Sequence, residues 1–174
     1  MKITLDHNCL IDLATGTQTG LRISELLAKP ASQPYIVNIG ASEMRERGIR
    51  PDRYDLFEEL LQAAGVYDAP RLDPALIWDV TFWDRCVWTG PDEAKLITEI
   101  ETILFGDSVP VSPTSGLDSP EWKKWLNRVC DVQTLWCHIR NGNELFLTSD
   151  KNFMKQSKLQ RLIALGAGSI RNPN

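Results

Sequence analysis

The chain has 174 residues, a length that fits one domain with a sizeable core and does not favour two. Hydrophobic residues make up 43% of the chain and charged residues 24%, and no apolar run approaches the roughly 18 residues of a membrane span. Asp6 interrupts the N-terminal apolar run, where a secretory signal would need further apolar residues. We therefore expect a soluble, cytoplasmic single domain over 1–174 with no membrane partner, and the net charge of -4 means that any nucleic-acid site must be local.

Strands and helices are predicted to alternate in the first third of the chain. The patterns predict a strand at 2–6, a helix at 8–15 ended by Gly16, a helix at 19–29 closed by Pro30, a strand at 34–40 and a helix from 41 that stops at Gly48. The helices are expected because apolar residues recur on one face of each, and the strands because they are β-branched and apolar.

The stretch 51–120 is expected to be an enlarged helical and loop segment, like an insertion within the domain. Amphipathic helices are predicted at 54–64 and 92–105, on either side of an aromatic-rich stretch. The density of Pro, Ser, Gly and Asp over 107–120 predicts an exposed loop.

The last third again alternates. It predicts one or two helices over 120–142, a strand at 144–150, a helix at 151–166 and a short strand at 168–172. Strands that are separated by helices, without hairpin signals, need crossover connections, so the sheet should be mainly parallel. The predicted fold class is α/β, a three-layer sandwich with a mainly parallel central sheet.

The cysteines and histidines do not form a zinc-binding pattern. No CxxC pair is present, and the only two histidines, His7 and His138, lie far apart in the chain. Cys130 and Cys137 are seven residues apart, which places both on one face of a helix as small buried hydrophobic side chains. Reduced thiols are therefore expected.

Four acidic residues are candidates for a common site at one edge of the sheet. Asp6 and Asp150 fall at the carboxyl ends of two predicted strands, where α/β proteins place their functional crevice. Glu43 lies in the first turn of the helix that follows a third strand, and Asp131 lies at an expected helix start. Carboxylates gathered at one edge repel one another, so the conjunction indicates a hard divalent cation as the counter-charge.

Each of these acids also has a simpler explanation. A helix cap would explain Asp6, an ion pair with Arg47 would explain Glu43, a helix-start acid would explain Asp131 and an Asx turn would explain Asp150. Only the conjunction of the four favours a site.

The same stretches resemble PIN domains. "LDHNCLIDL" is similar to their first strand, which ends in an acid and leads into an apolar helix, and "NIGASEMRE" is similar to their second strand and its glutamate. "CDVQTLWCHIRNGNELFLTSDKNF" is similar to their closing block, and "LGAGSIRNP" suits their last strand. The similarity covers both ends of the chain and leaves 51–120 without an aligned stretch.

The resemblance implies an acidic quartet that holds a metal. The catalytic and metal-binding residues would be Asp6, Glu43, Asp131 and Asp150, with Asn8, Thr148 and Asn152 as their polar neighbours. Glu46 would take the place of Glu43 in this quartet if the boundary of the preceding strand is shifted by one turn. Asn152 stands where many PIN domains have another acid, which lowers the negative charge of the site.

The implied activity is hydrolysis of phosphodiester bonds, with RNA as the expected substrate and Mg²⁺ or Mn²⁺ as the cofactor. Asp6 and Asp150 would be direct ligands, Asp131 a ligand of the same or a second ion, and Glu43 a ligand or a partner of the attacking water. The family also suggests a homodimer and, for the toxin of a toxin–antitoxin pair, an antitoxin protein as partners.

Cations next to the acids would contact the nucleic acid. Three clusters stand near the quartet: Arg45, Arg47, Arg50 and Arg53; Lys123, Lys124 and Arg128; and Lys151, Lys155, Lys158 and Arg161. The predicted contacts are Arg45, Arg47, Lys151 and Lys155, although solvated helix faces would give the same pattern. Trp78, Trp83 and Trp88 would suit base stacking, but tryptophan at this density is more typical of a core.

Three alternatives stay open. A catalytically silent PIN-like module that binds nucleic acid or protein would explain the same pattern, and the absence of one acid would favour it. A phosphatase of the haloacid dehalogenase type needs a second acid two residues after Asp6, where this chain has Asn8. A small-molecule Rossmann enzyme would need Gly-x-Gly-x-x-Gly after the first strand, which is missing.

Overall fold

The computed structural model describes residues 1–44, 53–106 and 119–174. The predictions for Arg45 and Arg47 and for most of the loop at 107–120 therefore lie outside the described residues. Within the described ranges, no helix is both long and apolar enough to cross a membrane.

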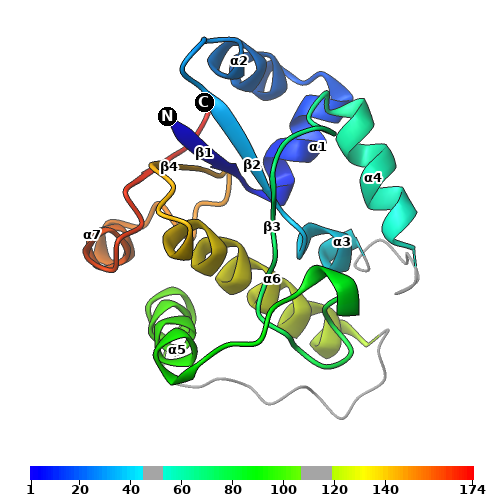
Figure 1. Ribbon diagram of the computed structural model, residues 1–174. Coiled ribbons are helices and arrows are strands. Elements are labelled where there is room, and N and C mark those ends of the chain that lie inside the picture. Colours follow the sequence, from blue (N-terminus) through cyan, green and yellow to red (C-terminus); the bar gives the residue numbers. More distant parts are fainter. Residues whose placement is uncertain (45–52, 107–118) are drawn as a thin grey trace.

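A five-stranded parallel sheet forms the centre of the fold (Figure 1). Its strands are β1 Lys2–Leu5, β2 Gln33–Val37, β3 Arg71–Leu72, β4 Leu145–Leu147 and β5 Ser169–Arg171. Their order in space is β3-β2-β1-β4-β5, and every neighbouring pair is parallel. The predicted α/β class is confirmed, and parallel pairing brings the carboxyl ends of all five strands to one edge of the sheet.

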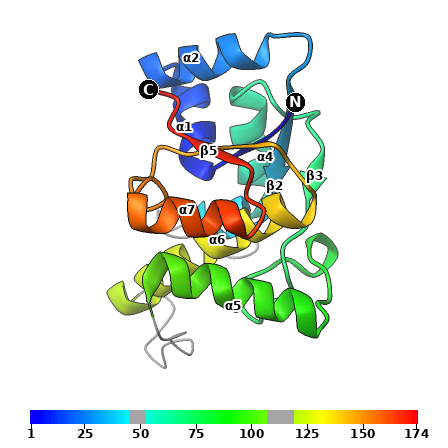
Figure 2. The same ribbon diagram turned by 90° about the vertical axis from the view of Figure 1, so that its left-hand side faces the viewer.

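Helices cover both faces of the sheet and give the three expected layers (Figures 1 and 2). One face carries α1 His7–Thr15, α2 Gln18–Leu27 and α4 Tyr54–Ala63. The other carries α5 Pro91–Phe105, α6 Pro120–Arg140 and α7 Gln156–Ala164. The short helix α3 Gly40–Glu43 packs against both α4 and α6.

The strands send alternate side chains to the two layers of helices. Ile3 and Leu5 of β1 belong to the apolar cluster under α1 and α4, whereas Thr4 between them contacts α6. Phe146 of β4 pairs with Thr4 in the register and joins the cluster under α6. Both faces of the sheet are thus buried, which is the usual condition of parallel strands.

The ends of the first helix match their sequence signals. The Asp6 side chain caps α1 by accepting a hydrogen bond from the backbone N–H of His7. Gly16 ends the helix with a φ of 64°, a left-handed conformation that glycine adopts without steric cost. The predicted stop at Gly16 is confirmed.

Two close approaches depend on glycine and place α1, α2 and α3. A Cβ at Gly20 of α2 would lie 2.1 Å from the carbonyl oxygen of Asp12 in α1. A Cβ at Gly40, the first residue of α3, would lie 2.8 Å from the Phe57 ring and 3.1 Å from Nδ1 of His7. The start of α3 therefore lies against the start of α1, close to Asp6.

The segment 51–120 contributes more to the fold than the predicted helices and loop. It supplies β3, the edge strand beside β2, which the sequence analysis did not predict. The strand predicted at 34–40 is shorter, because it ends at Val37 and the chain turns into α3 at Gly40.

Asp131 was predicted to lie at a helix start, and this was wrong. It lies in the interior of α6. Ser119 caps this helix by accepting from the N–H of Trp122, and the helix then continues over 21 residues. The side of α6 that was expected to be polar is also buried, because Thr134 is 3% exposed and His138 is fully buried.

Candidate functional site

Two hydrogen bonds hold the Asp6 carboxylate at the carboxyl end of β1. Its Oδ1 accepts from the backbone N–H of His7 at 2.9 Å, and its Oδ2 accepts from the hydroxyl of Thr148 at 2.7 Å. Asp6 is only 3% exposed. Because Thr148 directly follows β4, the second bond ties together the ends of two neighbouring strands.

Burial raises the pKa of Asp6 from 3.8 to about 6, and the nearby charge of Asp150 adds to this rise. The hydrogen bonds from Thr148 and His7 oppose it. Thr148 is bonded to both residues and β1 lies beside β4, so the two acids stand at neighbouring strand ends, as their places in the sequence predict. Such a pair is unfavourable when both members are ionised, and a cation beside it would relieve the repulsion.

A tight turn after β4 orients Asp150. Its backbone N–H donates to Oγ1 of Thr148 at 3.0 Å, and its Oδ1 accepts from the backbone N–H of Asn152 at 2.7 Å. Thr148 therefore contacts both acids, since its hydroxyl donates to Asp6 and accepts from the backbone of Asp150.

Asn152 acts on this site through its backbone, while its side chain points elsewhere. Its Nδ2 donates to the carbonyl of Leu104 at the end of α5 at 3.3 Å, and its Oδ1 accepts from Nζ of Lys158. Lys158 also donates to the Leu104 carbonyl. The side chain thus joins the 148–152 turn to α5 and α7.

Glu43 and Asp131 lie on helices that pack against each other, α3 and α6. Both side chains are partly exposed. However, in the described parts of the chain no group of three or more His, Cys, Asp or Glu side chains is arranged to hold a metal ion. The structure brings Asp6 and Asp150 together and does not join all four predicted acids into one compact cluster.

Three of the predicted polar and basic neighbours are exposed. Asn8 is exposed on α1, two residues after Asp6, and Lys151 and Lys155 are exposed between β4 and α7. Two cations of the predicted clusters are instead paired with acids. Arg53 binds Asp55 at 2.6 Å, and Arg128 binds Glu101 of α5 at 2.8 Å.

The sequence analysis missed a polar group at the same edge of the sheet. Asp73 directly follows β3, and its Oδ1 accepts from Nδ2 of Asn38, which directly follows β2, at 2.6 Å. The hydroxyl of Tyr54 in turn donates to Oδ1 of Asn38 at 2.7 Å. The signal was present, because "RLD" at 71–73 repeats the apolar residue and acid that end the first strand.

A buried polar network supports β1 from below the site. Nε2 of His138 lies 2.9 Å from the carbonyl oxygen of Ala167, and its Nδ1 lies 2.8 Å from the hydroxyl oxygen of Thr4. The Thr4 hydroxyl oxygen also accepts a hydrogen bond from Nδ2 of Asn143 at 2.8 Å. Burial lowers the pKa of His138 to about 4. A neutral imidazole with its proton on Nε2 satisfies all three contacts, so His138 has a structural role.

The expectation that the tryptophans at 78–88 belong to a core was wrong. Trp78 is 69% exposed, Trp83 67% and Trp88 77%. The segment instead contacts the core through Ala75 and Val80, which are buried, and through Ile77 and Val87, which are partly buried. The four cysteines, by contrast, are free thiols, and Cys130 and Cys137 are buried as predicted.

Comparison with protein-family models, curated proteins and solved structures found no match to this chain. The likeness to PIN domains therefore stays a prediction from the quoted motifs.

The donor set of this pair fits a Mg²⁺ or Mn²⁺ ion. Mg²⁺ is usually bound through one or two carboxylates and keeps several waters, so a cluster of three or more acids is not required. Each oxygen of Asp6 accepts one hydrogen bond, from His7 or from Thr148, and retains a second lone pair. Two hard oxygen donors are thus available where negative charge accumulates.

Proposed function

We propose that this protein is a metal-dependent nuclease that hydrolyses phosphodiester bonds, with RNA as the substrate. The observation that supports it is the pair of carboxylates, Asp6 and Asp150, at the ends of adjacent parallel strands and linked through Thr148. The PIN-like motifs around both acids agree with this chemistry. The free thiols fit a reducing compartment, so we also propose a cytoplasmic location.

Each residue of the site has a defined task in this proposal. A bound Mg²⁺ or Mn²⁺ would polarise a phosphodiester oxygen and lower the pKa of a water. Asp6 and Asp150 would hold the ion, and Thr148 keeps Asp6 oriented and favours its ionised form by donating a hydrogen bond. Glu43 lies on α3 and Asp131 on α6, and in this proposal a carboxylate from one of these helices would orient the attacking water.

The local cations would supply the attraction for the polyanion. Lys151 and Lys155 are exposed beside the Asp150 turn and would contact phosphates. The net charge of -4 gives no attraction of its own, so binding should weaken steeply as salt is added.

A cleavage assay with matched variants tests the proposal. Purified protein is incubated with end-labelled single-stranded RNA, or with DNA of the same sequence, in Mg²⁺, Mn²⁺ or a chelator. We expect RNA cleavage that the chelator abolishes and that Asp6→Asn and Asp150→Asn each reduce by at least about a hundredfold. The control is Asp68→Asn, because Asp68 is exposed and precedes the amino end of β3, at the opposite edge of the sheet.

Metal binding gives a readout that does not depend on activity. Mn²⁺ binding followed by electron paramagnetic resonance should be weaker in Asp6→Asn and Asp150→Asn and unchanged in Asp68→Asn. Equal binding in all four proteins, together with cleavage that no variant alters, would contradict the proposal.

The second candidate is a catalytically silent PIN-like module that binds nucleic acid or protein. It is favoured by the lack, in the described residues, of a group of three acids arranged to hold a metal. In that case RNA would be bound in a salt-dependent way without cleavage, and Lys151→Ala with Lys155→Ala would weaken binding while Asp6→Asn would not.

A further inference from the structure

A groove lies between α5 and α7, two helices that stand side by side on one face of the sheet (Figure 2). Its volume is about 350 Å³, and ligand pockets usually measure roughly 300 to 1,000 Å³. Helix α5 lines it with Thr98, Glu99, Thr102 and Ile103, and the end of α7 lines it with Arg161, Ala164 and Leu165.

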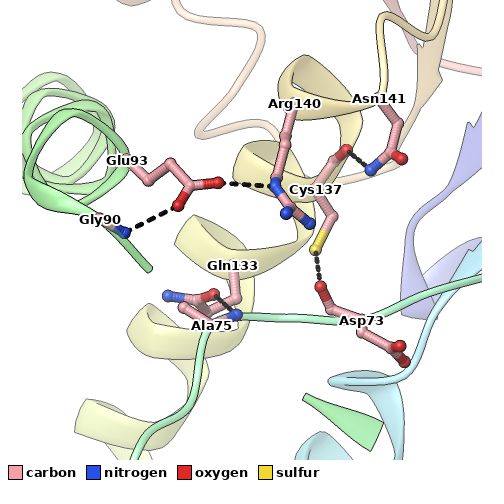
Figure 3. Close-up of polar contacts among 8 residues, drawn as sticks. All are labelled: Asp73, Ala75, Gly90, Glu93, Gln133, Cys137, Arg140 and Asn141. Atoms are coloured by element: carbon pink, nitrogen blue, oxygen red, sulfur yellow. Dashed lines mark hydrogen bonds and ion pairs between the residues drawn. The ribbon is translucent and has the colours of Figure 1, made fainter. Parts of the chain in front are cut away.

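Both walls of this groove are held in place. At the start of α5, Glu93 accepts from the N–H of Gly90 and from Nε of Arg140 in α6 (Figure 3). At the end of α5, the carbonyl of Leu104 accepts from Nζ of Lys158 in α7. The groove is therefore preformed, so a ligand would spend little free energy on ordering its walls.

Apolar side chains from both helices supply a surface for an apolar group. Ile103 is 7% exposed and belongs to the apolar cluster that includes the buried side of α6, and the partly buried Leu165 packs against that cluster. Ala164 is exposed and adds only a methyl group. An apolar side chain of a ligand would be removed from water by contact with these three residues.

The available charge in this groove is that of Arg161. Its side chain is exposed and forms no ion pair within the described parts of the chain. The carboxylate of Glu99 is already paired with Lys95 at 3.9 Å, and Lys158 is engaged with the end of α5. An unpaired guanidinium favours a carboxylate, which it can bind through two parallel hydrogen bonds.

Two threonine hydroxyls present hydrogen-bond acceptors from α5. Oγ1 of Thr98 donates to the carbonyl of Ala94 at 3.0 Å, and Oγ1 of Thr102 donates to the carbonyl of Thr98 at 2.9 Å. Because each hydroxyl uses its one proton within the helix, its oxygen is left to accept. The matching group on a ligand is an N–H. A carboxylate, an apolar side chain and an N–H occur together at the carboxyl terminus of a polypeptide.

We propose that this groove binds the carboxyl terminus of a partner polypeptide that ends in an apolar residue. The terminal carboxylate pairs with Arg161, the last side chain packs against Ile103 and Leu165, and the last N–H donates to a threonine hydroxyl of α5. The terminus of this chain itself is engaged elsewhere, because Oδ1 of Asn174 accepts from Thr19 of α2. The proposal is independent of the nuclease site, since no residue that lines the groove takes part in that site.

The test is a titration of the full chain with the peptide acetyl-Gly-Ser-Gly-Leu, followed by the backbone N–H signals of α5 and α7 in NMR spectra. Three matched peptides each lack one group. A carboxyl-terminal amide lacks the charge, a final glycine lacks the side chain, and an ester in place of the last amide bond lacks the N–H. We expect the parent peptide to shift the signals of Thr102 and Leu165 and to bind at least about fivefold more tightly than the amide and the glycine peptide.

Matched variants of the protein locate the binding site. Arg161→Gln should weaken binding of the parent peptide by at least about fivefold and should leave binding of the amide unchanged, because the amide has no carboxylate to lose. Thr102→Val should weaken the parent peptide and leave the ester peptide unchanged. The control is Arg22→Gln, which removes the same charge from an exposed position of α2 on the other face of the sheet, and binding should be unaffected.

Three results would overturn the proposal. They are no binding of the parent peptide, equal binding of the parent peptide and its amide, and binding that Arg161→Gln weakens no more than Arg22→Gln does. A single-stranded oligouridine serves as a parallel probe. If it displaces the peptide and shifts the same signals more strongly, the groove belongs to nucleic acid and the proposal is wrong.

Discussion

The hydroxyl of Thr148 donates a 2.7 Å hydrogen bond to Oδ2 of Asp6 and so joins the ends of β4 and β1. This bond favours the ionised form of Asp6 against the effect of burial. It also fixes the direction of the carboxylate, because the other oxygen is held by the N–H of His7. The site therefore depends on a threonine that has no charge of its own.

We predict that Thr148→Val raises the pKa of Asp6 above its wild-type value of about 6 and weakens Mn²⁺ binding. Valine keeps the shape and removes the donor. Carbon-13 NMR titration of the Asp6 carboxyl group measures the change, and Thr148→Ser, which keeps a hydroxyl, should restore most of it. An unchanged Asp6 titration in Thr148→Val would mean that the hydrogen bond has no electrostatic role.

The stability of the protein should depend on pH through Asp6. The pKa of Asp6 is about 6 in the folded protein and 3.8 ordinarily, so the folded state holds the proton more tightly. Between these values stability falls as pH rises, and above them the ionised carboxylate costs roughly 3 kcal/mol. Asp6→Asn should therefore be more stable than wild type near neutral pH and equally stable in acid.

Urea unfolding with a chelator present measures this difference at both ends of the pH range. His138 has the opposite effect, because its lowered pKa makes stability rise with pH between about 4 and 6.5, but it contributes equally to both proteins and cancels. Added Mg²⁺ should then stabilise wild type and not Asp6→Asn. If Asp6→Asn is less stable than wild type at neutral pH without metal, then the ionised Asp6 carboxylate does not destabilise the folded protein.

The buried network at Thr4 gives a third prediction. Thr4→Val would leave Nδ1 of His138 and Nδ2 of Asn143 without their partner in a fully buried place. Each such group costs about 1 to 3 kcal/mol, so the free energy of unfolding should fall by roughly 2 to 6 kcal/mol.

Chemical denaturation measures the loss, and two controls separate the hydroxyl from the methyl group. Thr4→Ser keeps the hydroxyl and should be much closer to wild type. Thr98→Val changes an exposed threonine whose hydroxyl bonds only within α5, and it should alter stability by less than about 0.5 kcal/mol. A Thr4→Val protein as stable as wild type would refute the assigned network.

The architecture could be predicted from the sequence because its signals are local. Alternation of apolar strands with amphipathic helices predicted the parallel sheet, and the left-handed Gly16 matched its predicted stop. The strand β3 was missed because its two residues, Arg71 and Leu72, are too few to show a period.

The site was predicted only in part, because its geometry depends on tertiary packing. Asp6 and Asp150 could be placed together, since each directly follows a strand and parallel strands share an edge. Glu43 and Asp131 lie on helices, and the reach of a helical side chain depends on how α3 and α6 pack, which no spacing reveals. The exposure of Trp78 and Trp83 likewise depends on what lies above the segment, and not on its composition.

The buried ion pair between α5 and α6 gives the last prediction. Nε of Arg128 lies 2.8 Å from Oε1 of Glu101, with side chains that are 16% and 10% exposed, and burial raises the pKa of Glu101 while Arg128 opposes the rise. Removing Arg128 would leave the Glu101 carboxylate without its counter-charge, so Arg128→Met should lower the free energy of unfolding by about 3 to 5 kcal/mol. The double variant with Glu101→Met should recover much of the loss, because two apolar side chains then pack where two charges had been desolvated.

Urea unfolding of the four proteins in a double-mutant cycle gives the coupling energy. The exposed pair of Arg53 and Asp55, with side chains 44% and 55% exposed, serves as the control and should couple by less than about 1 kcal/mol. If the Arg128 and Glu101 pair couples no more strongly than this exposed pair, then packing and not charge joins α5 to α6.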